Sequence, residues 1–137
     1  MIKSLKKLYN KILDNISKIF FKMYMLYIKL YSTFFFTNIP DIKTHLTLEE
    51  KYLLHTSILH NSICVEIGSY LGASSCYIAA SKNCQKLYCI DTWANEGMSE
   101  GLRDTFDEFI DNTKKFWHKL LYYEEKAMTW VNHFLKI

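Results

Sequence analysis

The chain has 137 residues, the length of one small domain, and half of these residues are hydrophobic, which excludes an intrinsically disordered chain. Its net charge of +3 is unevenly distributed. Residues 1–36 contain seven lysines and one acid, Asp14, and so carry +6, whereas the remainder contains ten basic and thirteen acidic residues and carries −3. A basic segment therefore precedes a mildly acidic body. We predict no nucleic-acid partner.

The cysteines and the start of the chain indicate a cytoplasmic protein. No cysteine pair has C-x-x-C spacing, and no histidine lies at metal-ligand spacing from a cysteine, so we expect buried reduced thiols and no metal. The basic start is not followed by a compact apolar stretch with a cleavage site, so we expect no signal peptide. The four cysteines are Cys64, Cys76, Cys84 and Cys89.

Residues 1–36 are predicted to form one long helix, because apolar residues recur at alternating spacings of three and four. Lys18, Lys22 and Lys29 interrupt the apolar stretch, so we do not expect a membrane span. Three interpretations stay open: the helix packs on its own domain, pairs with another helix, or lies in a membrane interface with its lysines facing anionic headgroups. The stripe comprises Ile2, Leu5, Tyr9, Ile12, Ile16, Ile19, Met23, Leu26 and Leu30.

Residues 37–46, which contain the single proline Pro40, are predicted to form a linker. A second helix is expected to begin after Thr47, because Thr47 and Glu50 have the spacing of a capping box. His55 and His60 lie on or near this helix without a partner acid or cysteine at a useful spacing. We interpret both as surface or packing histidines.

The next segments predict alternating strands and helices. Residues 62–67 (SICVEI) and 86–91 (KLYCID) are short apolar runs typical of buried strands in a parallel sheet. Small residues from Ser74 on favour a helix between them, and residues 98–113 form an amphipathic helical pattern that includes Leu102. This order predicts an α/β fold built from parallel βαβ units.

The loop after the first strand is the candidate binding site, because ligands of open α/β sheets lie where a strand ends and a helix begins. We expect Gly68 to adopt a positive φ in the exit turn and Gly72 to let the backbone approach a ligand. Ser74 and Ser75 provide hydroxyls and free amides at the positive end of the next helix, which favours an anionic group. Asp91, at the end of the second strand, can accept hydrogen bonds from ribose hydroxyls.

Two residues favour a ligand with an amine and no phosphate. Tyr70 occupies the position of the middle glycine of a dinucleotide-binding fingerprint, which leaves less room for a pyrophosphate. Glu66 adds negative charge just before the turn. S-adenosylmethionine fits these features, with its ammonium near Glu66, its carboxylate on backbone amides and its ribose on Asp91. The alternative of a plain strand-to-helix turn with a solvated Asp91 stays open.

The stretches VEIGSYLGASS, IDTW and DTFDEFIDNT resemble those of class I S-adenosylmethionine-dependent methyltransferases of a bacterial branch, over about residues 47–113. The resemblance implies a Rossmann-like fold, of which residues 47–113 would be a part. It implies O-methyl transfer to a small molecule or sugar. It also implies that the methionine side of the cofactor is bound by the loop, that Asp91 binds the ribose, and that Thr92 and Trp93 lie near the adenine edge. The loop residues are Glu66, Gly68, Ser69 and Gly72.

Residues 114–137 depart from that family and are expected to form an atypical, helix-like tail without a third strand. The family's later acidic motif does not follow Thr113, and neither a catalytic base nor a metal site is identified. We therefore expect a chain that lost its catalytic half or its reading frame near Phe116, and that has no methyltransferase activity. The second functional class is a non-catalytic module that binds a partner or a membrane surface, or self-associates, through residues 1–36.

Overall fold

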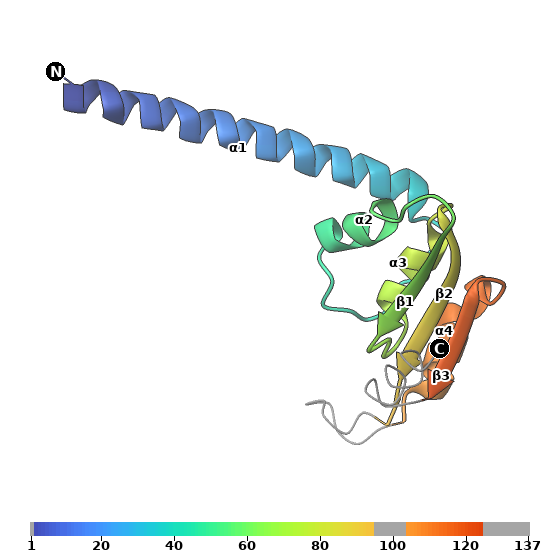
Figure 1. Cartoon of the computed structure of the whole chain (residues 1–137). Coiled ribbons are helices and arrows are strands. Elements are labelled where there is room, and N and C mark those ends of the chain that lie inside the picture. The colour runs from blue at the N-terminus through green and yellow to red at the C-terminus, as the bar shows by residue number, and fades with distance from the viewer. Residues whose placement is uncertain (1, 95–103, 125–137) are drawn as a thin grey trace. The chain divides into compact units, whose positions relative to one another are not determined.

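The computed structural model describes residues 2–94 and 104–124, and the chain divides into two compact units, Met1–Thr37 and Asn38–Ile137. The first unit consists of one helix, α1 (Ile2–Phe35), which is continuous over 34 residues (Figure 1). The predicted long helix is therefore confirmed. Within the described residues, no helix is long and apolar enough to span a bilayer.

The second unit begins with an irregular segment and a short helix, α2 (Leu48–Thr56). The predicted capping box is confirmed: the Glu50 amide donates to the Thr47 hydroxyl over 3.2 Å, and the Glu50 carboxylate accepts from the Thr47 amide over 2.7 Å. These two bonds satisfy backbone donors that a helix start leaves unpaired, and they fix where α2 begins. His55 is buried, so the interpretation of His55 as a packing histidine is confirmed.

Three parallel strands form the sheet in the order β1-β2-β3 (Figure 1). Strand β1 (Ser62–Ile67) pairs with β2 (Cys84–Asp91), and helix α3 (Ala73–Ala80) connects them. Helix α4 (Phe106–Thr113) and a short 3-10 helix, η1 (Lys114–Phe116), lead from β2 to β3 (Leu120–Glu124). The predicted α/β class, the two parallel strands and the connecting helix are confirmed.

The third strand corrects the expectation of a tail without a strand. Residues 120–124 pair in register with residues 87–91 of β2. The sequence LLYYE has no β-branched residue and no clear alternation, so its strand conformation depends on tertiary contacts. Leu120 is buried, and the Tyr122 ring contacts Phe106 and Phe109 of α4. Residues 125–137 lie outside the described part of the chain.

Helix α4 is shorter than the helix predicted over residues 98–113. It begins at Phe106, after Thr105 at the N-cap position, and the Asp104 carboxylate accepts from the Phe106 amide over 2.8 Å. This bond offers the backbone a turn in place of a further helical residue, which explains why the helix does not extend to Asp104. Residues 98–103, including Leu102, lie outside the described residues.

The core lies between the sheet and helices α3 and α4. Leu87 and Cys89 of β2 are fully buried there, together with Phe109 of α4. Trp93, just beyond β2, is 1% exposed, and its ring lies 4.8 Å from that of Phe109. These contacts pack the end of β2 against α4. The loop after β1 lies against both of them.

On the other face of the sheet the side chains of β1 are apolar and exposed, which corrects the expectation that β1 is a buried strand. Ile63, Val65 and Ile67 alternate along β1 and are 63%, 45% and 54% exposed. Tyr88 of β2 and Tyr123 of β3 stack on each other with ring centroids 6.2 Å apart. A parallel sheet is normally covered on both faces. In the described part of this unit, α3 and α4 cover one face.

Candidate functional site

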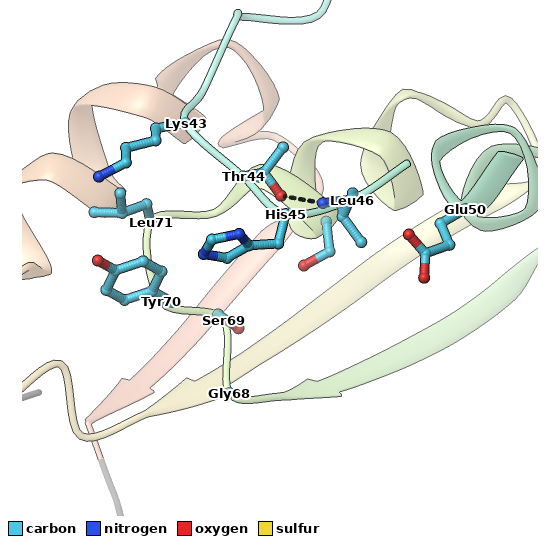
Figure 2. Close-up of a pocket in the computed structure, with 11 residues that line it drawn as sticks. Lys43, Thr44, His45, Leu46, Glu50, Gly68, Ser69, Tyr70 and Leu71 are labelled. Atoms are coloured by element: carbon cyan, nitrogen blue, oxygen red, sulfur yellow. Dashed lines mark hydrogen bonds between the residues drawn. The ribbon is translucent and has the colours of Figure 1, made fainter. Parts of the chain in front are cut away.

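A pocket of about 380 Å³ lies at the carboxyl end of β1 and the amino end of α3. One wall is the glycine loop after β1, and the other is the irregular segment before α2 (Figure 2). Its volume is at the lower end of the range of about 300–1,000 Å³ that is usual for small-molecule sites. The lining residues are Lys43, Thr44, His45, Leu46, Glu50, Gly68, Ser69, Tyr70, Leu71, Ala73 and Ser74.

Gly68 opens the loop with a left-handed backbone conformation. Its φ is +84°, as the sequence analysis predicted, and its amide donates to the carbonyl of Ile90 over 2.8 Å. A Cβ built on Gly68 would meet nothing within 4 Å. The glycine is therefore required for its backbone conformation and not because a neighbouring atom occupies the space.

Gly72 has a packing role in addition to the one predicted. Its φ is +83°, and a Cβ there would lie 2.5 Å from Thr113 Cγ2 and 3.1 Å from Phe109 Cδ2. Those two atoms belong to α4, so the missing side chain lets the loop approach another helix of the same protein. Close packing of the loop on α4 is thus a reason for a glycine at this position, and the approach of its backbone to a ligand stays a prediction.

The Ser69 hydroxyl is the most unusual polar group of the loop. Ser69 is 2% exposed, and within residues 2–94 and 104–124 its hydroxyl has no hydrogen-bond partner. The thiol of Cys89 lies close enough for the hydroxyl to affect the pKa of that thiol, but a thiol is a weak hydrogen-bond partner. A buried hydroxyl without a good partner is unfavourable unless a ligand or water supplies one. Ser69 lines the pocket, but its hydroxyl is buried in the pocket wall, so a bound molecule could supply that partner only if the side chain rotated toward it.

The amino end of α3 also faces the pocket. Gly72 occupies the N-cap position, and no described side chain caps the helix there. Ser74 lines the pocket, whereas the hydroxyl of Ser75 donates to the Glu66 carboxylate. The helix start therefore offers backbone amides and its positive dipole end to an anionic group.

Glu66 and Asp91, the two acids that were predicted to bind the ligand, both accept hydrogen bonds from other residues of the protein. Glu66 bonds Ser75 of α3, as described above. Asp91 accepts from the amide of Tyr70 through Oδ2 at 2.7 Å and from the amide of Trp93 through Oδ1 at 2.9 Å. Asp91 thus links the glycine loop to the turn after β2. Neither Glu66 nor Asp91 belongs to the residues that line the pocket.

Trp93 is a core residue in this structure. Its indole N–H donates to the carbonyl of Tyr70 over 2.9 Å, and its ring lies at the edge of Phe106 as well as against Phe109. With 1% exposure it has almost no surface to offer an adenine ring. Thr92 is half-buried, and residues 95–103, which follow this turn, lie outside the described residues.

The second wall of the pocket was not predicted from the sequence. Residues 43–46 were interpreted as part of a linker, yet they lie across from the glycine loop, and the His45 ring points toward Ser69 and Tyr70 (Figure 2). Lys43 brings a positive charge to the same wall. The signal available in the sequence was the pair Lys43 and His45 shortly before a capped helix, but no local pattern indicates which loop such a segment will face.

Four of the nine predicted site residues line the pocket, namely Gly68, Ser69, Tyr70 and Ser74. Gly72 and Asp91 do not line the pocket: Gly72 packs against α4, and Asp91 accepts hydrogen bonds from the amides of Tyr70 and Trp93. The buried thiols offer no nucleophile: burial first, and then the nearby Glu66, raises the pKa of Cys76 and of Cys89 to about 12. Among the described side chains, no group of three or more His, Cys, Asp or Glu could hold a metal ion.

Comparisons with known proteins add no assignment. No protein-family model matches the chain. No curated protein matches it. The geometry of the pocket and the residues that line it are therefore the basis for a function.

Proposed function

We propose that residues 38–124 form the cofactor-binding part of a Rossmann-like fold and that the pocket binds S-adenosylmethionine. The observation that carries this proposal is the pocket beside the amino end of α3, where no described side chain caps the helix and where the wall contains the buried Ser69 hydroxyl, which has only the weakly bonding Cys89 thiol near it among the described residues. An open α/β sheet places its ligands at this position, beyond the carboxyl end of a strand.

The lining residues suit the methionine part of that cofactor. Its carboxylate would meet the amides at the start of α3 and the positive charge of Lys43, and Ser69 would supply a hydroxyl. Asp91 keeps lone pairs on both carboxylate oxygens after accepting the two amides, so a ribose hydroxyl could still donate to it. S-adenosylmethionine supplies a methyl group on a positively charged sulfur.

A dinucleotide fits less well than S-adenosylmethionine. Tyr70 stands in the loop with a φ of +46° and lines the pocket where a fingerprint glycine would leave room for a pyrophosphate. Two phosphates would also bring two negative charges to a site that offers one helix start and one lysine and that also contains the carboxylate of Glu50. A single carboxylate beside the helix start and Lys43 matches these groups better.

We further propose that the chain transfers no methyl group by itself. Acceptor substrates need a surface that orients them beside the methyl donor. In the described sheet β1 is an edge strand, and its apolar face carries the exposed side chains of Ile63, Val65 and Ile67. The side of β1 on which an acceptor surface could be built is therefore open.

Titration calorimetry with the full chain tests the binding proposal. We expect S-adenosylmethionine and S-adenosylhomocysteine to bind and NAD⁺ to bind at least tenfold more weakly. Ser69→Ala should weaken binding by about 0.5–1.5 kcal/mol, the usual net contribution of a neutral hydrogen bond. Lys82→Ala, on an exposed lysine that does not line the pocket, is the matched control. Equal affinities for S-adenosylmethionine and NAD⁺, or no effect of Ser69→Ala, would contradict the proposal.

Transfer is tested separately with methyl-labelled cofactor and a panel of sugars and phenols. We expect no label in the acceptors above the buffer control. Turnover that Ser69→Ala diminishes would show that the chain is a complete enzyme.

A further inference from the structure

From residue 7 on, helix α1 carries its lysines and a broad set of its apolar residues on different sides, whereas Lys6 lies beside the apolar side. At 100° per residue, Lys7, Lys11, Lys18, Lys22 and Lys29 fall within an arc of about 60°. The opposite arc, about 140° wide, contains only Ile, Leu, Met, Phe and Tyr between residues 5 and 34. The helix therefore has one broad apolar side and one narrow basic side.

The apolar side is exposed. Its side chains between residues 5 and 30 have exposed fractions from 43% at Ile16 to 67% at Phe20. The unit that contains α1, Met1–Thr37, has no second described helix or strand that could cover this side. A soluble chain rarely leaves so long an apolar side in water without a partner.

We propose that α1 lies along the surface of an anionic lipid bilayer, with its apolar side in the acyl-chain boundary and its lysines at the level of the phosphates. An interfacial helix sinks about 5–10 Å, so its opposite side reaches the headgroups. At about 1.5 Å per residue α1 is roughly 50 Å long, which gives it an extended contact with the surface. Among the described residues, no helix is long and apolar enough to cross a bilayer, so we propose that α1 lies along the surface.

Charge decides between a bilayer and a second copy of the helix. Residues 1–36 carry +6, and the single acid Asp14 already pairs with Lys18 at 2.6 Å. A second copy of the helix offers no further acid that could pair with the remaining lysines, whereas an anionic surface attracts each of them. The apolar side also contains Tyr9 and Tyr27, and tyrosine is enriched at membrane interfaces.

Vesicle flotation with the full chain tests this proposal. Vesicles with 30% phosphatidylserine in phosphatidylcholine should bind the chain at least tenfold more tightly than phosphatidylcholine alone, and 0.5 M salt should weaken that binding. The double variant Lys11→Glu and Lys22→Glu should lose at least tenfold in affinity for the anionic vesicles. The control Lys82→Glu and Lys86→Glu changes the net charge by the same amount on two exposed lysines of the other unit and should stay within twofold of the wild type.

A second pair of variants tests the apolar side. Phe20 lies on the apolar arc and Phe21 beside the lysines, and both are exposed, at 67% and 60%. Phe20→Ser should weaken vesicle binding severalfold more than Phe21→Ser, although both change helix propensity equally. Equal binding to neutral and anionic vesicles, or equal effects of the two lysine pairs, would overturn the proposal. So would the absence of vesicle binding together with oligomers in analytical ultracentrifugation, which would assign the helix to self-association. These outcomes are independent of whether the pocket binds S-adenosylmethionine.

Discussion

The substitution Gly72→Ala provides a direct test of how the glycine loop is held. The new Cβ would lie 2.5 Å from Thr113 Cγ2, closer than folded proteins allow, and 3.1 Å from Phe109 Cδ2. It would also place a side chain on a residue with a φ of +83°. Left-handed conformation costs a non-glycine residue about 1–2 kcal/mol, and overpacking a filled core costs about 1–3 kcal/mol.

We therefore expect Gly72→Ala to lower the free energy of unfolding by about 2–5 kcal/mol, against a total of about 5–15 kcal/mol for a folded domain. Gly68→Ala is the matched control, because Gly68 has nearly the same φ of +84° but no atom within 4 Å of its Cβ. It should cost only the backbone term of about 1–2 kcal/mol. Urea unfolding of the full chain, followed by circular dichroism, measures both values.

A double variant separates the clash from other effects of Gly72→Ala. Thr113→Ser removes Cγ2 and keeps the hydroxyl that donates to the Phe109 carbonyl over 2.7 Å. Gly72→Ala should therefore cost less in the Thr113→Ser background than in the wild type. Equal costs of the two glycine substitutions, or no rescue by Thr113→Ser, would refute the argument that α4 occupies the space beside Gly72.

Three further predictions concern the support of the site and can be measured by urea unfolding. Asp91→Asn should lower the free energy of unfolding by about 1.5–3 kcal/mol, because the side-chain amide offers one acceptor oxygen to the two backbone amides of Tyr70 and Trp93; an unchanged stability would exclude Asp91 as the link between the loops. Trp93→Phe should cost about 1–3 kcal/mol by leaving the Tyr70 carbonyl without its donor, so a cost near zero would show that this bond is dispensable. Burial lowers the pKa of His55 below 6.5, so the unfolded chain binds more protons there and stability should fall as the pH drops through 6.5; His55→Gln should reduce this pH dependence, and an unaltered slope would contradict it.

The elements of the fold that could be predicted are specified by residues that lie close together in the sequence. The capping box of Thr47 and Glu50 fixes the start of α2 through bonds between residues three apart, and the apolar runs of β1 and β2 are bounded by turn residues. Strand β3 has no comparable signal. It becomes a strand because β2 offers unpaired backbone groups and α4 offers Phe106 and Phe109 to Tyr122, and such distant contacts leave no pattern in a sequence of five residues.

The candidate site was predictable only in part for the same reason. The positive φ of Gly68 follows from a glycine at the end of a strand, and it was confirmed. Gly72 and Trp93 were assigned to a ligand because a loop pattern shows which residues are close in sequence but not which way each one faces. Their neighbours are Thr113 and Phe109 of α4, which are about forty and sixteen positions away in the sequence.

Glu66 at the end of β1 and Asp91 at the end of β2 determine the shape of the loop beside the pocket, although neither residue lines the pocket. Glu66 receives the Ser75 hydroxyl and Asp91 receives two loop amides, so donors behind the loop already stabilise both negative charges. The groups that line the pocket include Lys43 and the start of α3, which are positive, and the carboxylate of Glu50, which already accepts from the amide and the hydroxyl of Thr47. Glu66 and Asp91 therefore fix the loop in a shape that presents the positive start of α3 to the pocket. That arrangement favours a ligand with a carboxylate, which is the part of S-adenosylmethionine that the proposed site would hold most directly.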